Sequence, residues 1–445
     1  MRPKPSQEKI EIAAKNANLV PMLTTLYQNL LRALSPAIDA YLHRRVAHGK
    51  EDPSRLEERK GVASRARPSG RLIWCHAASV GEAQSLLSLI KRLRSDYLDA
   101  SILVTTGTVT SAKLMAERLP EGAFHQYIPL DNPNWVKNFL DHWKPDLVLW
   151  VESDFWPALL AEVKRRDIPA VLLNARMSEK SFRRWKLARG LIADVLSAFG
   201  LCLAQNAKEA ERLTTLGAKN VCISRNLKYA ATPLPWGMQA LEEVKDLIGT
   251  RPHFLFAATH PGEGEIACQV HRNLRAQKPD LLTIILPRHP VRGQEIAKLA
   301  VSLGLKPALR SKREGIDSIT DIYIADTLGE TGLFYRLSPW CIMGGSFVPV
   351  GGHNPIEPAQ FGCRIIHGPH MFNFVTICED FHRQEAMLGV TGAEELQTEL
   401  SLALANPEHR ERMGKAAQSW VQDQAHVVDE IMQALSTYLK PEVAA

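Results

Sequence analysis

The feature that most constrains the fold of this chain is an alternation of short apolar runs with longer segments of helical spacing, which occurs twice. The first series of apolar runs covers residues 72–75, 101–104, 147–151 and 170–173. The second covers residues 254–257, 282–286, 322–325, 340–343 and 364–366. Short continuous apolar runs are typical of parallel strands buried on both faces, and helices cross between such strands. The alternation therefore predicts an α/β protein with two doubly wound, Rossmann-like domains.

A stretch with two prolines, Ala231-Thr232-Pro233-Leu234-Pro235, separates the two series and marks the predicted domain boundary. We expect a first domain at residues 71–232 and a second at residues 233–445, with the terminal helices in the second. A chain of 445 residues is long enough for two to three units of ordinary size. Residues 1–70 precede the first predicted strand and form a separate N-terminal segment.

The N-terminal segment combines an uncharged stretch with a basic one. Residues 16–31 carry no charge, and apolar residues recur at helical spacing from Leu19 to Leu42. Residues 41–71 hold nine Lys or Arg against four acids, a net charge of +5. The uncharged stretch is short for a membrane span and contains Pro21. Because the basic cluster follows the apolar part, the segment is no secretory signal either.

Two interpretations of the N-terminal segment stay open. Its helix could pack on the protein body, or it could lie in a membrane interface with a basic apron that docks on an anionic cytoplasmic leaflet. Nucleic acid is not an expected partner, because the basic stretch has no interleaved aromatic residues. The seven cysteines have no paired short spacing and lie mostly in apolar runs, which indicates buried, reduced thiols and no metal site.

The glycine-rich stretch from Gly344 to Pro358, GGSFVPVGGHNPIEP, follows the apolar run 340–343. Gly351 and Gly352 would let the backbone approach a ligand closely. His353, Asn354 and Glu357 add hydrogen-bonding groups, and Pro355 suits the first turn of a helix whose N–H groups face an anion. The stretch predicts a site for a phosphate or a sugar.

Further polar residues stand where predicted strands end, which is where open α/β sheets bind ligands. In the first domain they are Glu82, Glu152 and Asn174, with Lys228 near the domain boundary. Glu82 could act as a base or cap the helix that begins beside it. In the second domain they are His260, Arg288 and the stretch Asp326–Glu330. Arg288 could clamp a phosphate or serve as a surface ion-pair partner.

Taken in order along the chain, these motifs resemble the 3-deoxy-D-manno-octulosonic acid (Kdo) transferases of lipopolysaccharide synthesis. GGHNPIEP and the downstream GPHMFNF, Gly368–Phe374, are the most specific pieces. The resemblance implies a GT-B glycosyltransferase whose two domains face a central cleft. It implies transfer of Kdo from CMP-Kdo to a lipid A precursor (lipid IVA), with inversion and without cofactor or metal, at the cytoplasmic face of the bacterial inner membrane. The chain contains no Asp-x-Asp metal motif.

The resemblance also implies roles for individual residues. Glu82 matches the proton acceptor, and Glu152 and Lys228 match stabilisers of the transition state. The matches to the CMP-binding segments are Pro287, Arg288, Leu328, Gly329, Glu330, Asn354, Pro355, Ile356 and Glu357. Further candidates for the sugar-donor site are His260, Gly351, Gly352 and His353. The chain departs from the family pattern at Asp154, Arg225 and Ala230, where the family usually has Glu, Gly and Asp.

Two alternatives remain at the level of sequence. One is a GT-B transferase that uses another nucleotide sugar, such as a UDP-sugar. The other is a membrane-docked nucleotide-binding protein without turnover.

Overall fold

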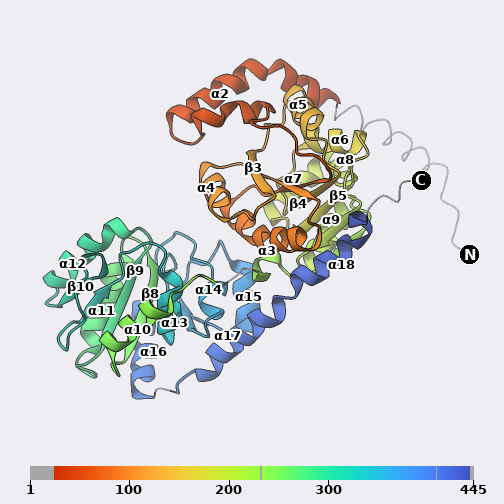
Figure 1. Ribbon diagram of the computed structural model, residues 1–445. Coiled ribbons are helices and arrows are strands. Elements are labelled where there is room, and N and C mark those ends of the chain that lie inside the picture. Colours follow the sequence, from red (N-terminus) through yellow and green to blue (C-terminus); the bar gives the residue numbers. More distant parts are fainter. Residues whose placement is uncertain (1–24, 231–232, 407, 441–445) are drawn as a thin grey trace, which may run out of the picture. The chain divides into compact units, whose positions relative to one another are not determined.

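The computed structural model describes residues 25–230, 233–406 and 408–440. The chain forms two compact units (Figure 1). One comprises Met1–Ala231 together with His426–Ala445, and the other comprises Thr232–Ala425. Each unit contains a parallel sheet with helices packed against it, so the predicted α/β class is confirmed.

The first unit is built on a seven-stranded sheet with the strand order β3-β2-β1-β4-β5-β6-β7. The strands are β1 (Leu72–His76), β2 (Ser101–Thr106), β3 (Ala123–Tyr127), β4 (Leu147–Val151), β5 (Ala170–Ala175), β6 (Leu201–Ala204) and β7 (Val221–Ile223). All its strand pairs are parallel. The strand order reverses between β1 and β4, which creates the crevice where doubly wound sheets bind ligands.

Helices cover both faces of the first sheet because successive strand residues point to opposite sides. In β1, Leu72 and Trp74 join one core, whereas Ile73 and Cys75 join the other. The first core is closed by α5 (Pro133–Trp143), α6 (Pro157–Arg165), α8 (Arg189–Leu196) and α9 (Ala207–Leu216), with α7 (Glu179–Leu187) beside them. The second is closed by α3 (Val80–Asp96), α4 (Val109–Arg118) and α18 (Val427–Leu439).

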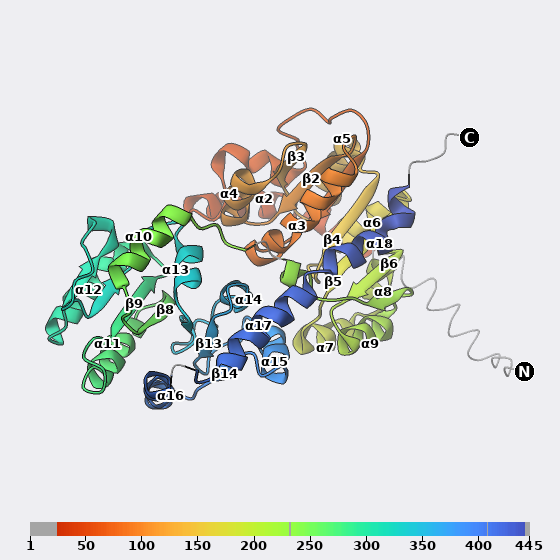
Figure 2. The same cartoon turned by 60° about the horizontal axis from the view of Figure 1, so that its bottom comes forward.

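The position of the last helix differs from the predicted domain division, which placed all of residues 233–445 in the second domain. α18 packs on the first unit beside α3, as both ribbon views show (Figures 1 and 2). Its apolar stripe, Val427, Ile431, Leu435 and Leu439, is buried with the residues of β1 and β2. A stripe at helical spacing predicts a helix, but it does not identify which distant sheet receives that helix.

The second unit repeats the architecture with the strand order β10-β11-β9-β8-β12-β13-β14. Its strands are β8 (His253–Thr259), β9 (Leu282–Pro287), β10 (Pro307–Leu309), β11 (Ile322–Ile324), β12 (Trp340–Met343), β13 (Arg364–His367) and β14 (Leu388–Gly389). Its helices are α10 (Met238–Ile248), α11 (Glu263–Leu274), α12 (Gly293–Ser302), α13 (Thr331–Leu337), α14 (Ile356–Ala359), α15 (Val375–Arg383), α16 (Ala393–Ala405) and α17 (Glu411–Gln424). The corresponding reversal of strand order lies between β8 and β12.

The N-terminal segment packs on the first unit through its described part, residues 25–33, α2 (Ser35–Ala47) and the 3-10 turn η1 (Pro53–Lys60). Tyr27 donates a hydrogen bond to Asp131 at 2.9 Å, and the Asn132 amide donates to the Leu31 carbonyl at 3.1 Å. The expected helix over residues 16–24 lies outside the described residues. None of the helices in the described ranges has the length and apolar character needed to cross a membrane.

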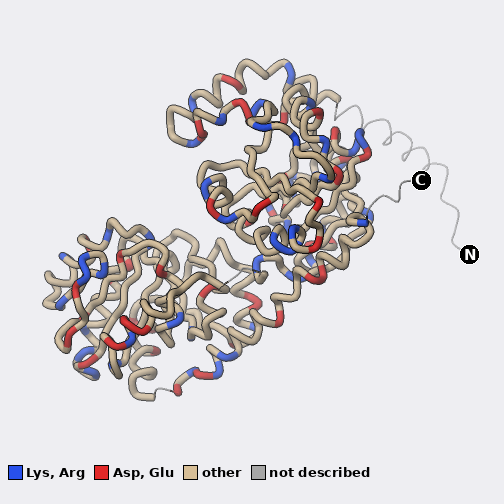
Figure 3. The backbone as a smooth tube through the Cα atoms, viewed as in Figure 1, with Lys and Arg blue, Asp and Glu red and all other residues tan. Residues whose placement is uncertain are grey.

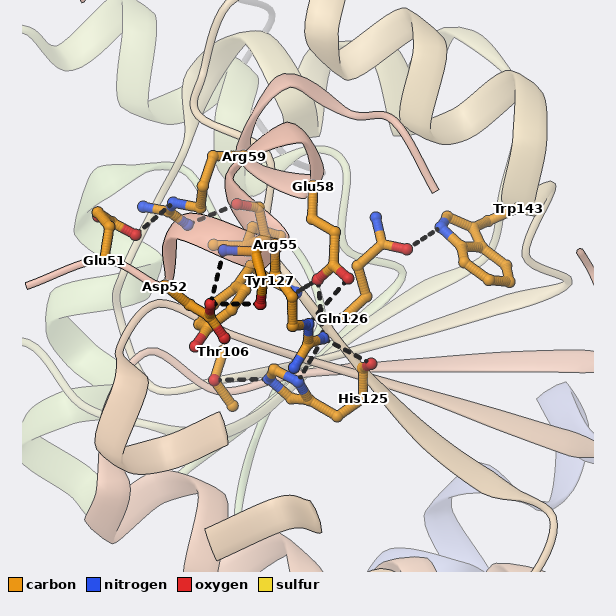
Figure 4. A network of polar contacts seen from close by, with 12 residues as sticks. Glu51, Asp52, Arg55, Glu58, Arg59, Thr106, His125, Gln126, Tyr127 and Trp143 are labelled. Atoms are coloured by element: carbon orange, nitrogen blue, oxygen red, sulfur yellow. Dashed lines mark hydrogen bonds and ion pairs between the residues drawn. The ribbon is translucent and has the colours of Figure 1, made fainter. Parts of the chain in front are cut away.

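Most cations of the basic stretch form contacts within the first unit, which corrects the expectation of a basic apron. Figure 4 shows Arg55 beside Glu58, His125 and Tyr127; it pairs with Glu58 at 2.8 Å and donates to the His125 carbonyl at 3.0 Å. Arg59 is buried and donates to the Ile128 carbonyl. The other engaged cations are Arg45, Lys60, Arg65, Arg67 and Arg71.

Acidic residues alternate with the cations along this stretch (Figure 3), and they neutralise much of its charge inside the unit. Arg44, Lys50 and Arg65 are the exposed members, and Arg65 stacks on the Phe124 ring. The net charge read from the sequence therefore overstates the charge that the stretch offers to a partner.

We expect Leu435→Ala to loosen the first unit although Leu435 lies at the C-terminal end of the chain. Truncating a buried leucine costs about 2–5 kcal/mol, and Leu435 packs in the core of β1 and β2. Hydrogen exchange followed by mass spectrometry should show faster exchange in residues 72–106 and unchanged exchange in residues 253–287. Leu400→Ala is the matched control, because Leu400 is equally buried in the second unit and should give the reverse pattern. Faster exchange confined to the second unit in Leu435→Ala would contradict the placement of α18.

Candidate active site

In the first unit the predicted polar residues meet at the reversal of strand order. β1 and β4 are parallel neighbours, with His76 opposite Trp150. The chain leaves β1 toward α3, which carries Glu82, and it leaves β4 through Glu152. The two carboxylates are near enough that the charge of Glu152 acts on the pKa of Glu82. The structure thus brings together two residues that are 70 positions apart in the sequence.

Glu82 takes part in the N-terminal cap of α3. Ser79 is the N-cap, and its hydroxyl accepts from the Glu82 backbone N–H at 3.3 Å. The Glu82 carboxylate accepts from the Ser79 hydroxyl at 2.7 Å and from the Ala78 N–H at 2.8 Å. Ser79 thus satisfies one donor of the first helical turn, and Glu82 satisfies the N–H of the residue before the cap. The capping interpretation is confirmed, and the same contacts fix the carboxylate at the sheet edge.

The pKa of the Glu82 carboxyl is raised above its ordinary value. Burial is the largest cause and the charge of Glu152 adds to it, whereas hydrogen bonds from Ser79 and Ala78 oppose the shift. A carboxylate with a raised pKa holds a proton more readily than an ordinary glutamate does. Such a group is suited to general-base chemistry near neutral pH.

Glu152 and Lys228 form an ion pair beside Glu82, with the Lys228 ammonium nitrogen 3.0 Å from Oε1 of Glu152. Both side chains are mostly buried. Glu152 has a φ of +60°, and Asn174, at the end of β5, has a φ of +52°. Non-glycine residues rarely adopt this conformation, and it is enriched at functional sites.

Two asparagines position Lys228 in the short 3-10 turn η2 (Leu227–Ala230). Asn226 Oδ1 accepts from the Lys228 backbone N–H at 3.0 Å, and Asn174 Oδ1 accepts from the Leu227 N–H at 3.0 Å. The role of Asn226 was missed at the sequence level, although an Asn two residues before a functional position is a signal for such a turn.

The three departures from the family pattern are accommodated by the fold of the first unit. Arg225 pairs with Glu430 of α18 at 2.6 Å, and the Ala230 carbonyl accepts from the Ser88 hydroxyl. Asp154 Oδ2 accepts from the Trp156 indole N–H at 2.8 Å. None of these contacts disturbs the pair formed by Glu152 and Lys228.

The second unit has a carboxylate anchor whose role the sequence did not reveal. Glu263 is buried, and its carboxylate accepts the N–H groups of His260 at 2.8 Å, Gly345 at 2.7 Å, Ser346 at 3.1 Å and Phe347 at 3.0 Å. These bonds tie the loop after β12 to the loop after β8. Gly344 is required there, because a Cβ would stand 2.3 Å from the Ala258 carbonyl oxygen.

A histidine pair stands at the reversal of strand order in the second unit. Nε2 of His260 lies 3.0 Å from Nε2 of His353, and the rings stack with centroids 5.2 Å apart. One of the two nitrogens must accept, so the two rings cannot both be fully protonated. Burial lowers the pKa of His353 to about 4, and the charges of His260 and Arg288 add to the shift. Arg288, the exposed residue after β9, is thus close to the pair.

Gly351 and Gly352 are needed for close packing, which the sequence did not reveal. Their φ angles are +106° and +76°. A Cβ on Gly351 would stand 2.3 Å from Asn373 Nδ2, and one on Gly352 would stand 2.1 Å from Met371 Sδ. A side chain at either position would collide with the downstream motif GPHMFNF, and approach of a ligand to these glycines stays a prediction. These glycines therefore permit packing between the two motifs.

The expected helix after Pro355 is only one turn long, because α14 has four residues. Asn354 Oδ1 accepts from the Ile356 N–H at 3.2 Å, so the start of the turn is already capped. Glu357 is half-buried, and its charge acts on Tyr335 and Cys341 behind it. One N–H of this helix start is therefore already taken by Asn354, and contact of the segment with CMP stays a prediction.

The stretch Leu328–Glu330 follows β11, next to β9 in the sheet. Leu328 is exposed, and Gly329 has a φ of +82°. The Glu330 carboxylate is engaged by Arg310 and by the Thr327 hydroxyl. What this loop offers a ligand is its backbone and the Leu328 side chain. Across the described ranges, no three His, Cys, Asp or Glu side chains converge as a metal site would require.

Comparison with known proteins agrees with this arrangement. The family model for 3-deoxy-D-manno-octulosonic-acid transferase (kdotransferase) matches residues 54–231. The chain is similar to the 3-deoxy-D-manno-octulosonic acid transferase of Rickettsia bellii, with 33% identity covering 93% of this chain and 99% of the relative. It is also similar to that of Haemophilus influenzae, with 32% identity covering 94% of this chain and 99% of the relative.

Solved structures with low sequence identity share the fold. A glycosyltransferase from Rickettsia africae has a TM-score of 0.54 at 13% identity, covering 84% of this chain and 100% of that one. The UDP-GlcNAc 2-epimerase of Neisseria meningitidis has a TM-score of 0.55 at 13% identity, covering 83% of this chain and 100% of that one. The two Rossmann-like units, together with these structural neighbours, place the chain in the GT-B class of α/β proteins.

Within that class, the chain belongs to the Kdo transferase family. It is a glycosyltransferase that transfers Kdo. The expectation of a nucleotide-binding protein without turnover is therefore wrong.

We expect Glu152→Gln to move the acid limb of the pH–rate profile to lower pH. If Glu82 must be ionised, the rate falls as pH drops through its pKa, which burial and Glu152 hold above the ordinary value of about 4.3. Removing the charge of Glu152 lowers that pKa, so the variant should keep a larger fraction of its own maximal rate at acidic pH. The measurement is kcat/KM against pH. Glu265→Gln, at an exposed position in the second unit, is the control and should leave the profile unchanged.

Proposed function

We propose that this enzyme transfers Kdo from CMP-Kdo to a lipid A precursor (lipid IVA), with inversion at the anomeric carbon and release of CMP. The observation that carries the proposal is the Glu82 carboxylate, fixed at the reversal of strand order with a raised pKa beside Glu152 and Lys228. Membership of the Kdo transferase family supports the identity of the sugar.

In the proposed reaction Glu82 takes the proton of the acceptor hydroxyl as that oxygen attacks the anomeric carbon of Kdo. The new C–O bond forms while the bond from the anomeric carbon to the phosphate oxygen breaks, and CMP leaves with the electron pair. Attack from the face opposite to CMP inverts the configuration. Lys228, held by Glu152, supplies a fixed positive charge for the transition state.

The proposed CMP-Kdo site lies in the second unit. Arg288 is a cation with a rigid fork of hydrogen-bond donors that suits a phosphate, and His260 and His353 stand beside it. Pro287, the loop Leu328-Gly329-Glu330 and the segment Asn354-Pro355-Ile356-Glu357 complete the set that the family resemblance assigns to CMP. Phosphate contacts of this kind do not distinguish CMP from UDP, so the alternative of another nucleotide sugar is tested by competition between the two nucleotides.

We place the enzyme on the cytoplasmic face of the bacterial inner membrane, where an acyl-chain acceptor would be embedded. Leu26, Leu30 and Leu34 are exposed at helical spacing on the anchored N-terminal helix, and Tyr41 is exposed on α2. Leucines at this spacing form one outward face. Arg44 and Lys50 are exposed nearby in sequence. Apolar side chains next to cations suit an anionic interface.

We expect Glu82→Gln to lower the transfer rate by about two to four orders of magnitude, the scale of a lost general base, while CMP affinity is unchanged. Product mass after incubation with CMP-Kdo and tetraacyl lipid A precursor, together with calorimetric titration of CMP, measures both. Ser79→Ala is the control, since it weakens the cap but leaves the carboxylate. Arg288→Ala should instead weaken CMP binding. A Glu82→Gln enzyme with more than about a tenth of the normal rate would show that Glu82 only caps α3.

We expect the triple variant Leu26→Ser, Leu30→Ser, Leu34→Ser to lose binding to anionic vesicles by at least about tenfold, because burial of leucine drives interfacial binding. Turnover on detergent-dispersed acceptor should change far less. Arg44→Gln with Lys50→Gln should remove only the salt-dependent part of the free energy of vesicle binding, about 1 kcal/mol for each cation. Leu187→Ser, at another exposed leucine of the first unit, is the control. Equal vesicle sedimentation of the triple variant and the unaltered protein would contradict the docking face.

A further inference from the structure

The histidine pair His260–His353 at the proposed donor site can hold one proton more than its internal hydrogen bond requires. Nε2 of His260 is 3.0 Å from Nε2 of His353, and the ring planes are inclined by only 15°. In the neutral pair one of these nitrogens donates to the other, which leaves Nδ1 of the donating ring without a proton. A further proton can bind there while the internal bond stays intact. The pair can therefore change from neutral to singly positive without a change of geometry.

Solvent can reach the pair through His260. Both rings of the pair are only partly buried. Nδ1 of His260 has no hydrogen-bond partner among the described residues, and it is not one of the buried polar atoms that lack a partner. This separates the pair from the fully buried histidines His76 and His271, whose unpartnered nitrogens are enclosed. A proton and an anion can thus both approach His260 from outside.

Cations face the pair from the connection that follows the neighbouring strand. Arg288 and His289 directly follow β9, and Arg292 lies in the next turn. The Arg288 backbone N–H donates to the Thr259 carbonyl at 3.0 Å, and Arg292 Nη1 approaches the same oxygen at 3.4 Å, which places both residues beside His260. The ring centroids of His289 and His260 are 6.4 Å apart. The positive charges of this connection oppose protonation of the pair.

The carboxylates near the pair do not balance these cations. Glu263 faces His260, but its oxygens already accept four backbone N–H groups. Glu295 pairs with Arg292 at 2.8 Å. Arg288 has no carboxylate partner among the described residues. With no anion bound, burial and the charge of Arg288 therefore hold the pKa of each histidine of the pair below its ordinary value, and the pair is neutral near neutral pH.

We infer that the His260–His353 pair takes up one proton from solvent when the sugar donor binds, so that the pair is a cation only in the occupied site. The inference rests on the proposed function, because it requires an anionic donor next to Arg288. A phosphate group beside Arg288 offsets the unpaired positive charge and brings a negative charge close to the pair. An opposite charge nearby favours the charged form of a histidine and raises its pKa. A neutral ligand leaves the pair uncharged, so the pair selects for an anionic donor.

Calorimetric titration of the unaltered enzyme tests the inference. The probe is the methyl ester of CMP, a phosphodiester like the donor, whose negative charge does not titrate near neutral pH. Titrations in two buffers that differ in ionisation enthalpy count the protons taken up, and we expect uptake close to one proton per bound ester at mildly acidic pH. Cytidine, which lacks the anionic group, should bind without proton uptake.

The affinity for the ester should depend on pH in the direction that proton uptake requires. Because the pKa of the pair is higher in the complex than in the free enzyme, the affinity rises as pH falls through the pKa of the complex. The rise is up to about tenfold per pH unit, and it levels off below the pKa of the free pair. Binding alone is measured, so the ionisation of Glu82 that limits turnover at acidic pH does not obscure the result.

Matched variants identify the groups that take up the proton. His260→Gln with His353→Gln keeps polar side chains that cannot ionise, so we expect the ester to bind without proton uptake and with a flat pH dependence. The control is His367→Gln with His382→Gln, because these histidines form a second pair with Nε2 atoms 3.0 Å apart at β13 and α15. His289→Gln removes a neighbouring histidine outside the pair. Both controls should keep the uptake.

Nitrogen-15 NMR of the unaltered enzyme adds a measurement in which no variant has to fold. The ring signals of His260 and His353 should change from the neutral to the imidazolium pattern when the ester is added. Binding of the ester without proton uptake, or uptake that persists in the variant that lacks both histidines, would overturn the inference and leave the donor site in place. Failure of the ester to bind would instead show that the donor site of the proposed function is wrong, and the inference would fall with it.

Discussion

The parallel pairing of strands around two reversals of strand order is the constraint on which the rest of the structure depends. In a parallel sheet the carboxyl ends of all strands lie at the same edge. At each reversal of strand order the two adjacent connections diverge and leave a crevice. Glu82 and Glu152 lie at the crevice between β1 and β4. His260 and the loop that carries His353 lie at the crevice between β8 and β12. The polar groups are separated by tens of residues in the sequence, and it is the sheet topology that makes them neighbours.

Each crevice contains a glutamate whose carboxylate accepts hydrogen bonds from the backbone, and the two glutamates differ in burial. Glu263 is fully enclosed and accepts four N–H groups, so its carboxylate is a structural anchor with no lone pair left for chemistry. Glu82 accepts one N–H and one hydroxyl, stays half-exposed and stands beside the charge of Glu152. Hydrogen bonds that favour the charged form compete there with burial and repulsion, and the latter prevail. One residue type thus gives an anchor in one unit and a candidate base in the other.

Much of the fold and part of the site could be predicted from the sequence. Apolar runs identified the strands that are buried on both faces, such as β1, β4 and β8, because continuous burial leaves a continuous signal. Edge strands such as β3 were missed, since Ala123–Tyr127 contains His125 and Gln126 and has no such run. Polar residues at strand ends were found for the same topological reason. The docking of α18, the engagement of Arg55 and Arg59, and the contact of Gly351 with Asn373 depend on long-range packing that local patterns do not encode.

The paired sets around His76 and His271 show why a list of residue types does not define a site. Each set joins a buried histidine to a threonine hydroxyl and to an aspartate 3.5–3.8 Å away. In the second unit the aspartate accepts from the Lys306 N–H and pairs with Arg275, while His271 Nε2 has no hydrogen-bond partner among the described residues. In the first unit Trp156 occupies one direction of Asp154 and leaves another open at the edge where β1 and β4 diverge. Exposure of the aspartate alone does not make the first set a binding site, because His76 is as fully enclosed as His271.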